Sequence, residues 1–159
     1  MVQVGDRIPE VALGKMTPAG PGTIGTGEIF GNKKVVLLGV PGAFTPTCSK
    51  QHLPGFLAQA DALRAKGVDT IACVSVNDAF VMDAWGQDQG AGESVLMLAD
   101  GSGVFAKALG LELDLIDAGL GVRNQRYSMV VEDGVVTHLN VEPGKECGVS
   151  SAETILDQV

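Results

Sequence analysis

The sequence predicts an α/β fold with a central mixed β-sheet flanked by helices. Two apolar runs, at 35–40 and 70–76, have the length and composition of buried strands, and a segment of helical periodicity follows each of them. An Asp-Gly pair at 133–134, between two apolar segments, is the strongest hairpin signal in the chain. We therefore expect parallel strands joined by helices, followed by an antiparallel pair that completes the sheet.

The first half of the chain begins with a region rich in turn residues. Prolines and glycines in residues 1–34 separate short apolar pieces, which predicts a hairpin and then a brief helix or turn near 26–30. After the strand at 35–40, apolar positions follow helical spacing over 51–66, and Gly67 ends this helix.

The second half alternates strand and helix before the hairpin. The strand at 70–76 precedes a helix from Asp78 to Gln89, which Asn77 or Asp78 caps. A strand at 95–99 and a short helix at 103–109 come next, and strands at 125–132 and 134–140 flank the Asp-Gly turn. A capping box at 150–153 opens a terminal helix. This order is that of the thioredoxin-like fold with an N-terminal extension, and residues 1–159 are predicted to form a single domain.

Composition argues against several kinds of partner. The formal net charge of −8 disfavours nucleic acid and anionic membranes, which both attract cationic surfaces. Apolar runs fall short of the roughly 18 residues of a membrane span, and the N-terminus does not resemble a signal peptide. Three cysteines are too few for a secreted disulfide scaffold. A cytoplasmic location fits best, and an organelle fits if a transit peptide has been removed.

Cys48 is the candidate reactive residue. It stands at the predicted start of a helix, where unpaired backbone N–H groups and the helix dipole favour the thiolate, which is the nucleophilic form. Thioredoxin-like oxidoreductases place a Cys-x-x-Cys dithiol here, but Thr45 replaces the first cysteine, which argues against a disulfide reductase. The Thr45 hydroxyl can instead donate to an oxygen bound beside the sulfur.

These residues also match a known family motif. Pro41, Thr45 and Cys48 fit Pro-x-x-x-Thr-x-x-Cys, and the chain resembles the peroxiredoxins. The wider stretches at 40–48, 51–56, 75–82 and 126–131 resemble the type II (subfamily five) branch, of the atypical two-cysteine or the one-cysteine kind. The resemblance covers nearly the whole chain.

The resemblance implies a thiol-dependent peroxidase that acts on hydrogen peroxide and alkyl hydroperoxides, with no cofactor and no metal. It implies that Cys48 attacks the peroxide and becomes a sulfenic acid. Thr45 would hold the peroxide, and Pro41 would shield the sulfenate. Arg126, in preference to Arg123, would stabilise the thiolate and the charge of the transition state.

The resemblance leaves the fate of the sulfenic acid open. Some plant-type relatives have a resolving cysteine at the spacing of Cys73, although a Cys48–Cys73 disulfide would require local unfolding. Mammalian-type relatives have one near Cys147, but the loop that carries it is shorter here. We favour single-cysteine chemistry, with glutathione and glutaredoxin, or a thioredoxin, reducing the sulfenate directly.

Two other groups of residues have alternative interpretations. His52, four residues after Cys48, would fit a Cys–His hydrolase pair or a two-ligand metal site, but we expect a partly buried packing residue, and His138 on a strand surface. Phe44, Phe80 and Trp85 pack in the core or, by resemblance, form a homodimer face. The alternative function is a thiol redox sensor or binding module that uses the same cysteine.

Overall fold

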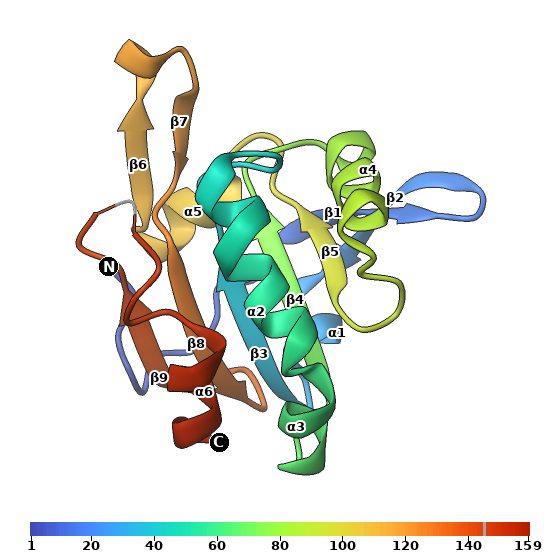
Figure 1. Ribbon diagram of the computed structural model, residues 1–159, viewed down its shortest axis with the longest axis vertical. Coiled ribbons are helices and arrows are strands. Elements are labelled where there is room, and N and C mark those ends of the chain that lie inside the picture. The colour runs from blue at the N-terminus through green and yellow to red at the C-terminus, as the bar shows by residue number, and fades with distance from the viewer. Residues whose placement is uncertain (145) are drawn as a thin grey trace.

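The computed structural model describes residues 1–144 and 146–159 (Figure 1). In this part of the chain, seven strands form one mixed sheet in the order β2-β1-β5-β4-β3-β8-β9. Strands β3, β4 and β5 are parallel, whereas β8 and β1 pair antiparallel with the outer two of them. The predicted mixed α/β sheet is therefore confirmed. The strands of this sheet are β1 (Ala12–Thr17), β2 (Gly20–Gly25), β3 (Lys34–Gly39), β4 (Thr70–Ser75), β5 (Leu96–Ala99), β8 (Tyr127–Glu132) and β9 (Val135–Val141).

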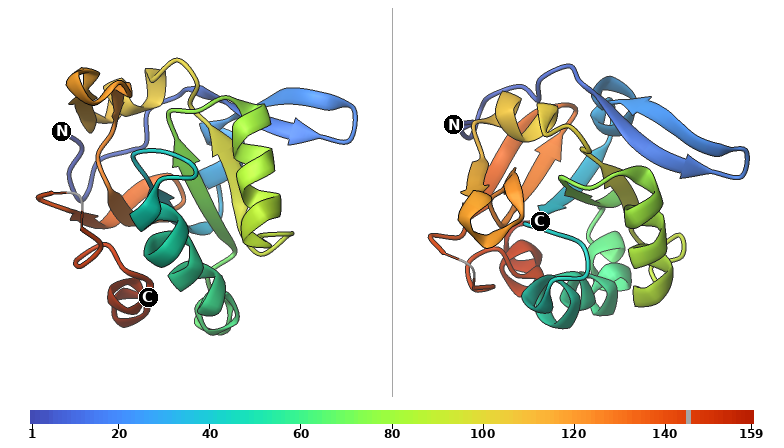
Figure 2. Two further views of the ribbon diagram at one scale, coloured as in Figure 1. Left: turned by 45° about the horizontal axis from the view of Figure 1, so that its top comes forward. Right: turned by 90° about the horizontal axis from the view of Figure 1, so that it is seen from above.

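Helices cover both faces of this sheet, and the view from above shows the layers (Figure 2). Helices α2, α3, α4 and α6 pack on one face, and α1 and α5 pack on the other. Successive residues of β3 face opposite clusters, Val36 and Leu38 on one side and Val35 and Leu37 on the other, as expected for a strand buried on both faces. The helices are α1 (Thr26–Phe30), α2 (Leu53–Ala58), α3 (Ala60–Ala65), α4 (Ala79–Gln89), α5 (Val104–Leu109) and α6 (Ala152–Gln158).

The helix predicted as continuous over 51–66 is divided into three pieces, so that prediction is wrong in detail. A π-helical turn, η1 (Cys48–His52), comes first, and the N–H of Leu53 bonds to the carbonyl of Cys48, five residues back. Pro54 explains this wider turn, because proline has no N–H to donate and its ring would clash with the carbonyl four residues before it. A break at Gln59 then separates α2 from α3.

One element was not predicted. Strands β6 (Glu112–Leu115) and β7 (Gly121–Asn124) form a separate antiparallel hairpin that projects from the sheet, with the 3₁₀ turn η2 (Ile116–Ala118) at its tip (Figure 1). The signal for it was present, because Leu113 and Leu115 alternate with acidic residues. We did not predict β6 because the segment is only four residues long and contains two acidic residues.

The predicted helix caps hold in part. Asp78 caps α4 by accepting from the Val81 N–H at 2.8 Å, and Ser151 caps α6 by accepting from the Thr154 N–H at 3.3 Å. Asn77 has a different contact: its Oδ1 accepts from the N–H of Ala43 at 3.0 Å. This bond ties the end of β4 to the turn that precedes Cys48.

The pairing of β3 with β8 brings distant segments together. Gly39, the last residue of β3, lies opposite Tyr127, the first residue of β8. A Cβ atom at Gly39 would overlap the Tyr127 ring, so glycine permits this close approach. The turn that begins at Pro41 therefore lies beside Arg126, the residue before β8.

Candidate active site

The structure brings Thr45, Cys48 and Arg126 into direct contact. Cys48 lies in the first turn of η1, is fully buried and is a free thiol. Its Sγ lies 2.9 Å from Oγ1 of Thr45 and 3.1 Å from Nη2 of Arg126. A hydroxyl and a guanidinium, from segments about 80 residues apart, thus converge on one sulfur atom.

The Thr45 hydroxyl has two competing acceptors. Its Oγ1 lies 2.7 Å from the carbonyl oxygen of Gly42 as well as 2.9 Å from Sγ of Cys48, and a hydroxyl has a single proton to donate. When Cys48 is a thiol, Thr45 can donate to Gly42 and accept from the S–H group. When Cys48 is a thiolate, the hydroxyl can donate to the sulfur instead. Thr45 can therefore serve both protonation states by rotating one bond.

Arg126 is buried, and both its side chain and its backbone are fixed. Nη2 donates to Cys48, and Nη1 lies 3.0 Å from Nδ1 of His52. Its carbonyl accepts from the N–H of Glu142 at 2.9 Å. Because a guanidinium stays protonated in proteins, Arg126 brings a fixed positive charge to the sulfur and stabilises its anionic form.

Arg123 is close but makes different contacts. Its Nε donates to the carbonyl of Leu120 at 2.6 Å, and its Nη1 donates to the carbonyl of Pro41 at 3.3 Å. Arg123 therefore binds the backbone of the turn at Pro41, whereas Arg126 contacts the Cys48 sulfur.

Pro41 lies at an apolar hollow that leads toward these groups. The hollow has a volume of about 220 Å³. Its lining residues are Pro41, Thr45, Pro46, Thr47, Leu113, Leu115, Leu120 and Arg126. Three of them are leucines from the β6–β7 hairpin and its tip, so the element that the sequence did not reveal supplies one wall of the hollow.

The other two cysteines are less suited to nucleophilic attack. Cys73 is fully buried in β4, where burial first and the neighbouring Cys48 second raise the pKa of its thiol. Cys147 is half-buried near Ser150, and burial together with Glu142 raises the pKa of its thiol, partly offset by Arg126. Both groups are held in the thiol form, which is the poorer nucleophile.

His52 is more than the packing residue that we expected. It is buried against the edge of Phe56, with ring centroids 5.6 Å apart, so the packing interpretation holds in part. Both ring nitrogens are also engaged: Nδ1 with Arg126, and Nε2 with the carbonyl of Ser150 at 3.0 Å. Burial and then Arg126 lower the pKa of His52 to about 4.

Because both ring nitrogens of His52 already make hydrogen bonds, neither is available to act as a general base or to bind a metal ion. This geometry does not support a Cys–His hydrolase pair or a two-ligand metal site. The part of the chain that the structure describes contains no group of three or more His, Cys, Asp or Glu residues placed to hold a metal ion. His138 lies on β9, partly exposed, beside the Thr137 hydroxyl.

The three aromatic residues separate into two kinds. Trp85 is fully buried in its own chain, so for this residue the core interpretation holds and a place on an exposed face is wrong. Phe44 and Phe80 are 52% and 63% exposed, and they remain candidates for an interface. Phe44 also has a positive φ of 65°, which is uncommon for an aromatic residue.

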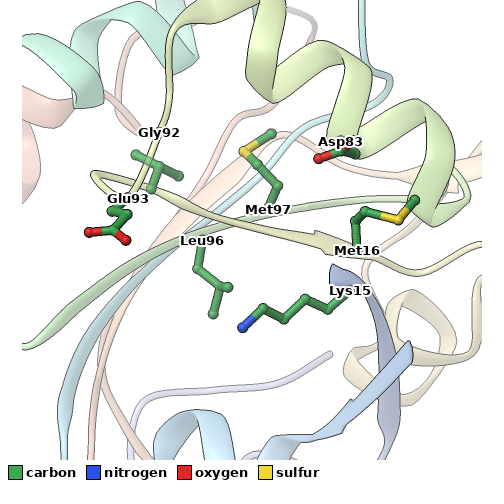
Figure 3. Close-up of a pocket in the computed structure, with 8 residues that line it drawn as sticks. Lys15, Met16, Asp83, Gly92, Glu93, Leu96 and Met97 are labelled. Carbon is green, nitrogen blue, oxygen red and sulfur yellow. The ribbon is translucent and has the colours of Figure 1, made fainter. Parts of the chain in front are cut away.

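A second hollow, of about 320 Å³, lies where β1 diverges from β5 below α4 (Figure 3). The two strands pair at Gly14 and Ala99, and beyond that point Lys15 and Met16 border the gap together with Asp83 and Met97. Met97 and Leu96 leave β5 on opposite sides in this view. Its lining residues include no thiol and no histidine, so it offers none of the chemistry found around Cys48.

Among the described residues, the helices are all too short or too polar to cross a lipid bilayer.

Comparison with known proteins agrees with this geometry. The redoxin family model matches residues 3–156. Peroxiredoxin-2E of Arabidopsis thaliana, a chloroplastic protein, is 49% identical in an alignment of 159 positions, gaps included, that covers 98% of this chain and 68% of that protein. Peroxiredoxin-2C of Oryza sativa subsp. japonica is 50% identical in an alignment of 158 positions that covers 98% of this chain and 96% of that protein.

The chain is also similar to a solved structure. Reduced Prx3 from Vibrio vulnificus, in complex with hydrogen peroxide, superposes with a TM-score of 0.95, is 56% identical and is covered over 99% of each chain. The chain therefore belongs to the redoxin family and is a peroxiredoxin of the type II branch, a thiol peroxidase with a thioredoxin-like fold.

Proposed function

We propose that Cys48 is the peroxidatic cysteine and that the chain reduces hydrogen peroxide and small alkyl hydroperoxides through a Cys48 sulfenic acid. One observation carries the proposal: the Thr45 hydroxyl and the Arg126 guanidinium both contact the buried sulfur at hydrogen-bond distance. These groups stabilise an anion at the sulfur, and they are also placed to stabilise charge on an oxygen beside it.

The reaction is a two-electron oxidation of sulfur. The Cys48 thiolate attacks the terminal oxygen of the peroxide, an S–O bond forms, and the O–O bond breaks. The leaving hydroxide or alkoxide takes a proton from solvent and departs as water or an alcohol. Arg126 stabilises the negative charge that develops on the leaving oxygen, and Thr45 orients the peroxide. Pro41, at the side of the hollow, limits water around the sulfenic acid.

The hollow beside the site supports the substrate assignment. Its volume of about 220 Å³ has room for a small organic group, and its leucine and proline lining favours an apolar one. Hydrogen peroxide is supported by the Vibrio vulnificus relative, whose crystal structure contains that molecule. We therefore expect both substrates to react, each with its terminal oxygen at the sulfur.

For recycling, we propose single-cysteine chemistry. The burial of Cys73 in a central strand and the raised pKa of both Cys73 and Cys147 disfavour a fast intramolecular disulfide. A glutathione thiol would instead attack the sulfenic acid, releasing water and forming a mixed disulfide. Glutaredoxin with a second glutathione would then release the Cys48 thiol and glutathione disulfide, or a thioredoxin dithiol would carry out both steps.

Assembly and location are part of the same proposal. We expect a homodimer that buries the exposed Phe44 and Phe80 rings, since aromatic groups are enriched in the cores of interfaces. A reducing compartment is needed to recycle the sulfenic acid. The cytoplasm supplies one, and the chloroplastic relative peroxiredoxin-2E supports the organellar alternative.

The test combines substitution with intact mass. Cys48→Ser should abolish peroxide consumption, while the matched variants Cys73→Ser and Cys147→Ser should retain it. After one equivalent of peroxide, the wild type should gain the mass of one oxygen atom and react with a sulfenic-acid trap such as dimedone. Turnover by Cys48→Ser would exclude this site. The loss of two hydrogen atoms, dependent on Cys73 or Cys147, would replace the single-cysteine cycle by a disulfide one. Reaction at the rate of an ordinary thiol would favour the redox sensor.

A further inference from the structure

We propose that His52 is a positioning residue, which holds the Arg126 guanidinium against the Cys48 sulfur. The inference deepens the proposed function and rests on it, because it assigns a new role at the same site. It starts from one contact, the 3.0 Å distance between Nδ1 of His52 and Nη1 of Arg126.

The neighbours of the imidazole determine its tautomer. Nε2 faces the carbonyl oxygen of Ser150 at 3.0 Å, and a carbonyl can only accept, so Nε2 carries the proton. Nδ1 is then an acceptor, which is what the guanidinium opposite it requires, since arginine can only donate. The neutral imidazole therefore accepts a charge-assisted hydrogen bond from Arg126.

The π-turn η1 carries two residues that contact the Arg126 guanidinium. Cys48 and His52 are its first and last residues. Their side chains contact different terminal nitrogens of the same guanidinium, Nη2 and Nη1 respectively. Arginine presents these nitrogens in a rigid planar fork, so fixing one of them restricts the direction of the other. His52 thereby helps to define where Nη2 points.

His52 is itself anchored to the loop that follows β9. Its partner Ser150 donates through both N–H and Oγ to Oε2 of Glu142, at 2.7 and 2.6 Å. Glu142 in turn donates its backbone N–H to the carbonyl of Arg126 at 2.9 Å. Arg126, His52, Ser150 and Glu142 thus form a closed ring of contacts, all with buried side chains. Fully bonded buried networks of this kind are rigid.

Two substitutions separate the two bonds of the imidazole. In His52→Asn, the amide oxygen can take the place of Nδ1 and accept from Arg126, but the side chain is too short to reach Ser150. In His52→Gln, the amide nitrogen can take the place of Nε2 and donate to Ser150, but the acceptor for Arg126 is lost. Both variants are polar and similar in size, so packing against Phe56 changes little between them.

The readouts are the second-order rate constant with hydrogen peroxide, the pH profile of Cys48 alkylation by iodoacetamide, and the melting temperature. His52→Gln should lower the rate constant about tenfold, the effect of one charge-assisted hydrogen bond, and move the alkylation profile to higher pH. His52→Asn should keep the rate constant within about twofold of the wild-type value, because its amide oxygen still accepts from Arg126. It should lower the melting temperature more than His52→Gln does.

Other outcomes overturn the inference. A wild-type rate constant and alkylation profile in His52→Gln would show that His52 does not position Arg126. Equal loss of rate in both variants, in proportion to the loss of melting temperature, would show a structural role alone. If His52→Gln did not fold, a rate constant in His52→Asn far below wild type would count against the inference. Each result is distinct from failure of the proposed function, which shows as peroxide turnover by Cys48→Ser.

Discussion

The indole nitrogen of Trp85 donates to Oγ of Ser49 at 3.0 Å, and this bond joins α4 to the residue directly after Cys48. Trp85 is fully buried, and it is the one tryptophan in the sequence. Buried indole groups normally find such a partner, so the bond contributes to holding η1 in place. The only indole of the chain is therefore linked by a hydrogen bond to the turn that carries Cys48.

Oxidation of Cys48 should change the fluorescence of Trp85. Adding an oxygen atom to a fully buried sulfur displaces its neighbours, and Ser49 transmits that displacement to the indole. Stopped-flow mixing with hydrogen peroxide should show a single fast phase whose rate rises linearly with peroxide concentration. The matched variant Cys48→Ser should show no such phase. A phase of the same amplitude in that variant would contradict this assignment.

Arg126→Lys should lower the rate constant with hydrogen peroxide about 100-fold, the usual effect of removing one preorganised donor from a transition state. A lysine ammonium cannot contact the sulfur and His52 with the fixed fork of a guanidinium. Arg123→Lys is the matched control, because Arg123 contacts the carbonyls of Leu120 and Pro41 instead. It should lower the rate far less. Equal losses in the two variants would refute the assignment of Arg126.

Gly39→Ala should destabilise the fold by about 1–3 kcal/mol or more, since the added methyl group would overlap the Tyr127 ring in a fully packed region. Gly27→Ala is the comparison, because Gly27 lies in α1 with open space around its Cβ position. That substitution should be neutral or stabilise by about 0.5–1 kcal/mol. Urea unfolding measures both changes. Similar free energies of unfolding for the two variants would mean that the β3–β8 contact is less tight than described.

Titration of His52 should make the fold less stable in mild acid. Its pKa is about 4 in the folded chain, below the ordinary value of 6.5, so the unfolded chain binds more protons as the pH falls through this window. The wild type should lose about 2 kcal/mol of unfolding free energy between pH 7 and pH 5 from this group.

The His52→Gln variant isolates that contribution, because glutamine does not titrate. The pKa of Glu142 is also lowered, mainly by its hydrogen bonds to Ser150 and despite opposing burial, so its stabilisation is lost only at more acidic pH. Urea unfolding of both proteins at pH 7, 6 and 5 measures the difference. Parallel losses of stability in the two proteins would show that His52 does not titrate as described.

Local patterns were sufficient for much of the fold. The apolar runs of β3 and β4, the Asp-Gly turn between β8 and β9 and the cap of α4 follow from neighbouring residues, and each was predicted within a few positions. Gln59 and Pro54 show the limit of this approach, because the helical spacing of apolar residues continues across both interruptions. The spacing of apolar residues indicates which face of a helix is buried. It does not indicate whether one turn of that helix is α-helical or π-helical.

The candidate site divides in the same way. Thr45 and Cys48 are three residues apart, so their proximity follows from the helical start itself. The role of His52 could not be predicted, because its partners Arg126 and Ser150 lie 74 and 98 residues away. Trp85 posed the same problem, since its polar partner Ser49 is 36 residues distant. Side-chain partners at such separations become visible only once the sheet has brought the segments together.

The complete burial of the Cys48 sulfur has a consequence for the catalytic cycle. The thiol of a reductant cannot contact this sulfur while η1 keeps the wound conformation of the structure. Part of η1 must therefore unwind before a reductant reaches an oxidised Cys48. Each turnover then depends on how often a few residues around Cys48 come loose, and this frequency, more than the affinity for peroxide, would set the pace of recycling.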